Sequence, residues 1–101
     1  MPKVSEACRY VRSKVAGPFW VTTDLFFKDQ ETFQRYSQSE ALSAASIGSI
    51  YGVDPALVQH YPVPDLNFLK ISYPRKGSAG GVEERDMHSG QQYVYMLDLE
   101  L

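Results

Sequence analysis

The segment from Phe19 to Phe27 places apolar and aromatic side chains on both faces of one extended stretch. Residues of this kind, rich in rings and β-branches, favour a pleated and half-buried backbone. One face carries Phe19, Val21, Thr23, Leu25 and Phe27, and the other carries Trp20, Thr22, Asp24 and Phe26. Because strands covered on both faces read as nearly continuous apolar runs, this segment is predicted to be a central strand. Both of its faces should be covered in the working form of the protein.

The neighbouring segments predict further short elements. Residues 5–12 alternate weakly in polarity and fit a short strand or one turn of helix, of which we favour the strand. Asp29 and Ser39 are expected to be the N-caps of two helices, because short polar side chains satisfy free N–H groups there. The second helix should end at Gly52, in the position that favours a left-handed residue. Inside that helix, Gly48 should cost about 1 kcal/mol relative to Ala.

The second half of the chain predicts a hairpin, a long loop and a last strand. Residues 58–61 and 68–73 are the hairpin strands, and the prolines between them indicate an edge position. Residues 74–92 have loop composition, whereas residues 93–101 alternate strictly and predict a strand. This order predicts an α+β two-layer sandwich with helices on one face of a mainly antiparallel sheet. A ferredoxin-like variant with a shortened or lost second helix is the expected topology, and it leaves the second sheet face poorly covered.

Length and composition narrow the class of protein. A chain of 101 residues is expected to form one domain, spanning residues 1–101. The net charge of −2 gives no sign of binding to nucleic acid or to a membrane. A single cysteine and the lack of an apolar leader predict a cytoplasmic location, and no metal or cofactor is expected. Aromatic residues make up 13% of the chain, so some rings should line a pocket or a subunit contact.

Positive charge precedes the central strand. Arg12, Ser13 and Lys14 stand beside a turn at Gly17, where cations and backbone N–H groups can hold a carboxylate or a phosphate. A solvated turn with two surface cations is the alternative, since the glycines and following helix of a phosphate loop are missing.

Asp24 lies in the middle of the predicted central strand, and Lys70 lies in the middle of another strand. A buried carboxylate needs a partner, because an uncompensated charge in apolar surroundings is costly. The two residues therefore predict a polar cluster in an apolar pocket. The equally acceptable alternative is an exposed cross-strand ion pair, worth at most about 1 kcal/mol.

Few other side chains suit chemistry. His60 is expected on a strand surface, whereas Asp86 and His88 lie in the charged loop and would enter a site if that loop closed. A nucleophilic pair of Cys8 with a histidine is disfavoured by residue type. The amide of Gln91 can bind a ligand or satisfy the loop backbone.

The string Arg-Ser-Lys-Val-Ala-Gly-Pro-Phe of residues 12–19 resembles a small domain-of-unknown-function family that accompanies proteins like acyclic terpene utilisation protein A. The resemblance continues in order through Thr22, Asp24, Phe26-Phe27, Lys70, Pro74-Arg75, Arg85-Asp86 and Gly90-Gln91-Gln92. The family has Asn where this chain has Val15, so a polar contact is lost there. The opening also resembles the ferredoxin-like domain attached to acyclic terpene utilisation proteins. The resemblance implies a larger partner subunit that handles acyl-CoA or organic-acid metabolites.

These observations give three functional hypotheses. In the first, the chain is the small subunit of a heteromeric metabolic enzyme that docks by its aromatic sheet face. It would bind an anionic substrate through Arg12, Ser13, Lys14, Gly17, Asp86 and Gln91. In the second, the chain is a lyase or isomerase of a carboxylated metabolite at a homodimer interface. Its acid–base residues would be Asp24, Lys70 and His88. The third is a purely structural interaction module.

Overall fold

The computed structural model describes residues 2–15, 19–74 and 96–101, and its core element is a four-stranded antiparallel sheet. The strands are β1 (Cys8–Val15), β2 (Trp20–Phe27), β3 (Gln59–Val63) and β4 (Phe68–Pro74), in the spatial order β1-β2-β4-β3. The prediction that residues 19–27 form a central strand is confirmed, since β2 lies between β1 and β4. The hairpin prediction is confirmed too, and β3 lies at an edge.

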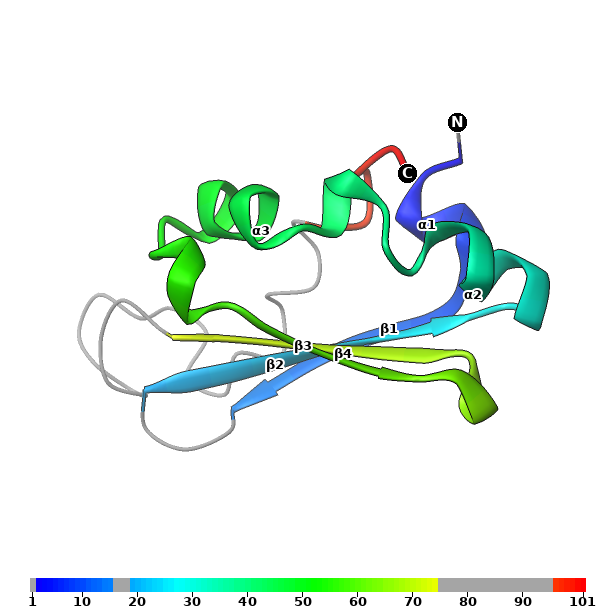
Figure 1. Cartoon of the computed structure of the whole chain (residues 1–101), viewed down its shortest axis with the longest axis horizontal. Helices are drawn as coiled ribbons and strands as arrows, with labels where there is room; N and C mark the ends of the chain where they lie inside the picture. The colour runs from blue at the N-terminus through cyan, green and yellow to red at the C-terminus, as the bar shows by residue number, and fades with distance from the viewer. Residues whose placement is uncertain (1, 16–18, 75–95) are drawn as a thin grey trace.

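The helical layer covers one face of this sheet. It contains α1 (Val4–Ala7), α2 (Gln30–Tyr36) and α3 (Ala44–Tyr51), with single 3-10 turns at Glu40–Leu42 and Pro55–Leu57. A further turn, Pro64–Leu66, joins β3 to β4. Figure 1 shows the three helices on the same side of the sheet and no helix on the other side among the described residues. The predicted α+β class with helices on one face is therefore confirmed.

Within this sheet, β2 and β3 are joined through α2 and α3, and β4 lies between them and pairs antiparallel with both. β2 and β3 therefore run in the same direction without being neighbours, which is the arrangement of a split βαβ unit. None of the helices in the described ranges is long and apolar enough to cross a membrane.

Local signals set the helix ends. The Asp29 carboxylate accepts a hydrogen bond from the Thr32 N–H at 2.7 Å and begins α2. The single predicted helix after Ser39 is instead a 3-10 turn followed by α3. It divides because Ser43 is extended and its hydroxyl caps the second piece. Gly52 ends α3 in the left-handed conformation, with φ of 67°, as predicted.

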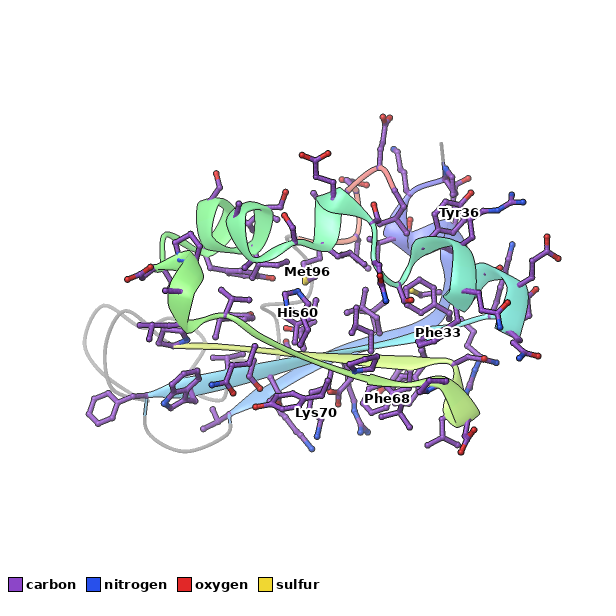
Figure 2. The ribbon with its side chains drawn as sticks, viewed as in Figure 1. Phe33, Tyr36, His60, Phe68, Lys70 and Met96 are labelled. Carbon is purple, nitrogen blue, oxygen red and sulfur yellow. The ribbon has the colours of Figure 1, made fainter. Side chains whose placement is uncertain are left out.

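The core lies between the sheet and the helices. Its β2 and β4 side chains, Val21, Leu25, Phe27, Leu69, Ile71 and Tyr73, are all buried. They pack against apolar residues of the helical layer and the C-terminus, which include Phe33, Leu42, Ile47 and Met96. In Figure 2, Phe33 and Met96 lie between the layers, whereas Phe68 and Lys70 lie on the opposite side of the sheet. The described part of the protein thus has one layered core and one sheet face without a helical cover.

Both ends of the chain differ from the sequence-based expectation. Residues 4–7 form one helical turn before β1, because Glu6 accepts a hydrogen bond from the backbone of Lys3. The strand predicted for residues 93–101 is wrong over its described part, 96–101, which forms a turn and a single bridge to Lys3. Along residues 97–101 the alternation leaves Asp98 and Glu100 exposed while Leu101 is buried in the core, and Met96 is buried outside this alternation. The predicted loop at residues 74–92 lies outside the described residues, apart from Pro74.

Candidate functional site

The sheet face that carries no helix holds three rows of side chains that run across the strands. Because side chains alternate between faces along a strand, every second residue of each strand lies here. The aromatic row is Tyr10, Phe26, Phe68 and Val63, the charged row is Arg12, Asp24, Lys70 and Tyr61, and the polar row is Lys14, Thr22, Ser72 and Gln59. Trp20 and Pro74 continue the face beyond the polar row. We call these residues, together with Arg9, the open face.

The aromatic row is a packed stack of rings. Phe26 and Phe68 lie parallel with their centroids 4.6 Å apart, and Tyr10 tilts against Phe26 at 5.7 Å. A register shift between Cys8 and Tyr10 gives β1 one extra residue, Arg9. The guanidinium carbon of Arg9 lies 5.6 Å from the Phe26 centroid. The guanidinium carbon of Arg12 lies 5.3 Å from the same centroid. One ring therefore contacts two cations, an arrangement that favours positive charge on this face.

The charged row contains a buried carboxylate. The Asp24 side chain is 0% exposed, and its Oδ2 accepts a hydrogen bond of 2.8 Å from Nε of Arg12. The Arg12 side chain is 46% exposed, and this hydrogen bond raises its pKa above the ordinary value. Lys70 lies directly across from Asp24 on β4, as the sequence suggested. Among the described residues, however, Asp24 forms its ion pair with Arg12 rather than with Lys70.

Within the described part of the chain, two polar atoms of the open face are buried and have no hydrogen-bond partner. They are Oδ1 of Asp24 and Oγ1 of Thr22, which are neighbours on the same face of β2. An unsatisfied buried polar group costs about 1–3 kcal/mol, so such atoms are rare in stable folds and point to a missing partner. The centre of the open face thus combines buried acceptors with the nearby cations of Arg12, Lys14 and Lys70. This arrangement can hold an anion and can accept a hydrogen bond from it.

The structure brings together part of the predicted site. Arg12, Lys14, Asp24 and Lys70 share the open face. Arg12, Ser13 and Lys14 lie within β1 rather than in a loop, because the strand extends to Val15. Ser13 is consequently buried and belongs to the opposite face from its two neighbours. The other predicted site residues, Gly17, Asp86, His88 and Gln91, lie outside the described residues.

Comparison with known proteins assigns the chain to a family. The chain belongs to the DUF4387 family. The model of that family, described as a domain of unknown function, matches residues 4–100 and therefore nearly the whole chain. Searches of the curated proteins and of the solved structures found no match. Membership of the DUF4387 family thus identifies the chain without adding an activity.

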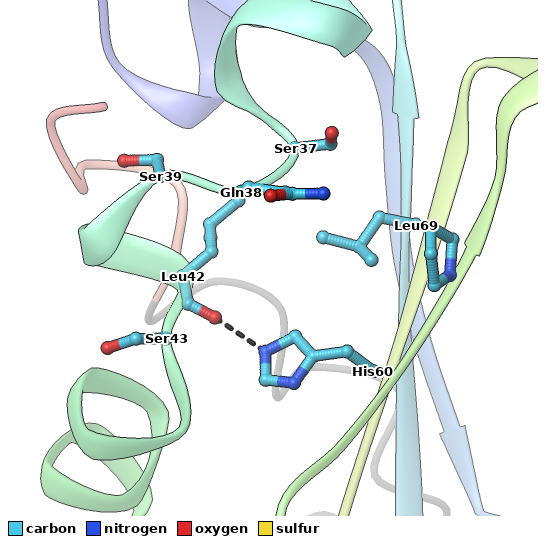
Figure 3. A pocket seen from close by; sticks show the side chains of 8 residues that line it. Ser37, Gln38, Ser39, Leu42, Ser43, His60 and Leu69 are labelled. Carbon is cyan, nitrogen blue, oxygen red and sulfur yellow. Dashed lines mark hydrogen bonds between the residues drawn. The ribbon is translucent and has the colours of Figure 1, made fainter.

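A small pocket lies on the other side of the sheet (Figure 3). It has a volume of about 280 Å³, and its wall includes Ser37, Gln38, Leu42, His60 and Leu69. Nε2 of His60 lies 2.6 Å from the Leu42 carbonyl oxygen, to which it donates a hydrogen bond. The expectation that His60 lies on a strand surface is wrong, because alternation along β3 turns it towards the helical layer.

Cys8 does not provide a nucleophile in the DUF4387 fold. Its side chain is buried at the start of β1, and burial raises the pKa of the thiol to about 12. Sequence reasoning did not assign Arg9 or Tyr10 to the site. It placed Thr22 on the same strand face as Asp24 but did not predict that its hydroxyl would be buried and part of the site. The register shift in β1 that places Arg9 against Phe26 has no signal in the sequence that we can identify.

Proposed function

We propose that this DUF4387 chain is the small subunit of a heteromeric metabolic enzyme and docks by its open face. The partner that covers the open face is a larger protein with an acidic and partly apolar surface. A protein of the acyclic terpene utilisation protein A type fits the sequence resemblance. Between the two proteins, Arg12, Lys14 and Lys70 would bind an anionic organic acid or acyl-CoA metabolite. The observation that carries this proposal is the separation of charge between the two sides of the fold.

Charge is distributed unevenly over the described residues. The open face has one carboxylate, Asp24, and four cations, Arg9, Arg12, Lys14 and Lys70. The other described residues have the cations Lys3, Lys28 and Arg35 and the carboxylates Glu6, Asp29, Glu31, Glu40, Asp54, Asp65, Asp98 and Glu100. The open face is therefore positive in a chain whose net charge is negative. Such a face attracts an acidic partner and repels a basic one.

Exposed rings make the same face suitable for protein contact. Tyr10 is 53% exposed in the aromatic row, and Tyr61 is 47% exposed at the end of the charged row. Aromatic side chains and arginine are enriched at protein interfaces, where they bury a large area at low entropic cost. Nucleic acid fits this face less well. Phe26 already stacks on Phe68 and contacts the guanidinium of Arg12, so this central ring is less available for stacking on a base.

The alternative is a lyase or isomerase that works alone at a homodimer interface. The free Oδ1 of Asp24 supports it, because an unpaired carboxylate oxygen beside Lys70 suits proton transfer. A symmetric dimer through the open face would place like charges opposite each other, which is unfavourable. The heteromeric arrangement avoids this repulsion and is the one we favour.

A matched set of charge reversals tests the docking proposal. Tagged wild-type chain, the double variant Lys14→Glu/Lys70→Glu and the control Lys28→Glu are isolated from the native extract, and their complexes are weighed by native mass spectrometry. Lys28 is exposed but lies outside the open face. We expect wild type and control to form the same heteromeric complex, and the double variant to be recovered alone. A wild-type chain that is recovered alone would contradict the proposal, and a homodimer mass would support the alternative.

A further inference from the structure

We propose that the centre of the open face selects hydroxycarboxylates over plain carboxylates and over amino acids. The binding centre consists of Lys14, Thr22, Asp24 and Lys70. This inference rests on the proposed function, because it names the class of anion that the same face would bind. It is carried by the two buried atoms of β2 that have no partner and by the cations on the strands that flank them.

The first step is the demand for a hydrogen-bond donor. An ion-paired carboxylate offers only acceptor atoms, and Oδ2 of Asp24 already accepts from Arg12. Oδ1 is buried and has no partner. The missing group at this point is therefore a donor, such as a hydroxyl. The nearby Oγ1 of Thr22 also lacks a partner and can either donate or accept.

The second step is the attraction of an anion. Lys14 lies across from Thr22 on β1, and Lys70 lies across from Asp24 on β4. Neighbouring strands are about 4.8 Å apart, so both flexible side chains can reach a ligand that lies over β2. Among the described residues, neither lysine forms an ion pair with a carboxylate. Within this part of the chain, both ammonium groups can therefore turn to a ligand carboxylate near Thr22 without breaking an ion pair.

The third step is the spacing between the two groups of the ligand. Thr22 and Asp24 are two residues apart on one strand face, which is about 7 Å between their Cα atoms. A ligand whose carboxylate lies near Thr22 and whose hydroxyl is on the third carbon spans much of this gap. Oδ1 is buried, so a neighbouring side chain must move before the hydroxyl can reach it, and the long chain of half-buried Lys70 can do so.

The fourth step separates a hydroxyl from an ammonium group. Both can donate to Oδ1, but three cations, Arg12, Lys14 and Lys70, surround the single carboxylate of Asp24. An additional positive charge would be repelled there, whereas a neutral hydroxyl would not. The centre should therefore favour a hydroxyl as its donor.

Three probes that differ in one substituent test this selectivity. Butyrate, 3-hydroxybutyrate and 3-aminobutyrate are titrated into the purified chain, and the backbone amide NMR signals are followed. We expect 3-hydroxybutyrate to shift the signals of Thr22 and Asp24 and to bind at least about fivefold tighter than butyrate, since hydrogen bonds to charged groups are strong. The amino analogue should bind more weakly than the hydroxy acid.

Two variants assign the selectivity to the orphaned atoms. Asp24→Asn replaces the charged acceptor Oδ1 by a neutral amide, so the charge-assisted hydrogen bond to the ligand hydroxyl is lost and the preference for the hydroxyl should fall, while butyrate should bind at least as tightly as before. Thr22→Val should weaken the binding of both acids, and it tests the position of the ligand carboxylate even if Asp24→Asn does not fold. The control is Thr23→Val, on the opposite face of β2, which should bind as wild type does.

The outcomes separate this inference from the proposed function. Equal binding of butyrate and 3-hydroxybutyrate would overturn the hydroxycarboxylate inference and leave the proposed anion site in place. Binding of neither acid would overturn both the inference and the anion site, but docking would still be judged by the mass of the native complex. Selectivity that is undiminished in Asp24→Asn would also overturn the inference, as would wild-type binding of both acids by Thr22→Val.

Discussion

Arg12 and Asp24 form an asymmetric ion pair across β1 and β2, in which a half-exposed guanidinium donates to a fully buried carboxylate at 2.8 Å. The asymmetry means that the two partners depend on each other unequally. Without Asp24, the guanidinium of Arg12 keeps its access to water. Without Arg12, the carboxylate of Asp24 stays buried and loses its ion pair, and a buried uncompensated charge is strongly unfavourable.

Replacement of Arg12 should therefore destabilise the fold more than replacement of Asp24. We expect Arg12→Ala to lower the melting temperature by several degrees and Asp24→Asn to lower it less. The control is Arg35→Ala, since Arg35 pairs with Glu31 at 3.8 Å on an exposed helix face. Thermal denaturation of wild type and of the three purified variants measures the loss of melting temperature caused by each substitution. Equal losses for Arg12→Ala and Arg35→Ala would contradict the account of the buried pair.

Adjacent threonines on β2 should respond to the same substitution with opposite signs. Oγ1 of Thr22 is buried without a partner, whereas Oγ1 of Thr23 lies 3.2 Å from the Tyr73 hydroxyl. Thr22→Val removes an unsatisfied group and should raise the free energy of unfolding by about 1 kcal/mol. Thr23→Val removes a hydrogen bond and should lower it by about 1 kcal/mol. Urea denaturation measures both, and a loss of stability in Thr22→Val would show that its hydroxyl has a partner in solution.

Gly48 should not tolerate alanine, although alanine is the better helix former. A Cβ atom there would lie 2.7 Å from the Val53 carbonyl oxygen and 3.0 Å from Cγ of Pro55. The clash outweighs the gain of about 1 kcal/mol in helix propensity, so Gly48→Ala should lower the free energy of unfolding by about 1–3 kcal/mol. Ser49→Ala, at an exposed position of the same helix, is the control. A Gly48→Ala variant as stable as wild type would mean that the chain after α3 moves easily.

The Cys8 thiol should be inert in the folded protein and should make stability depend on pH. Burial raises its pKa from 9.0 to about 12, so the folded state disfavours the thiolate. Stability from the neutral thiol is fully present below pH 9 and is lost as pH rises towards 12. Alkylation at neutral pH should then be slow and should follow the small equilibrium population of opened chain. Rapid alkylation of the native chain by iodoacetamide would contradict the burial of this side chain.

The parts of the fold that follow from local pattern could be predicted from the sequence. The two-sided apolar stretch of β2, the Asp29 cap and the left-handed Gly52 each report a local constraint. The end of the chain could not, because alternation in residues 96–101 reflects packing against the helical layer rather than pairing in the sheet. Alternation alone does not distinguish these two causes of burial.

The candidate site was predictable in its residue types but not in its geometry. Asp24 and Lys70 were expected to meet, and the sheet register places them opposite each other. Residue types alone could not select Arg12 as the ion-pair partner of Asp24, because that choice depends on the register of β1 against β2. The same register turns Ser13 away from its two cationic neighbours.

Hydroxyl-radical footprinting of the native complex tests the central claim, that the open face is the docking surface, most directly. The free chain and the complex are oxidised in parallel, and modification is quantified at each aromatic residue. Tyr10, Tyr61 and Phe68 belong to the open face, whereas Tyr36 and Tyr51 pack against the core in the helical layer. We predict that the complex protects the first three rings and leaves the other two unchanged. Protection of Tyr36 or Tyr51 with no change at Tyr10 and Tyr61 would contradict the account.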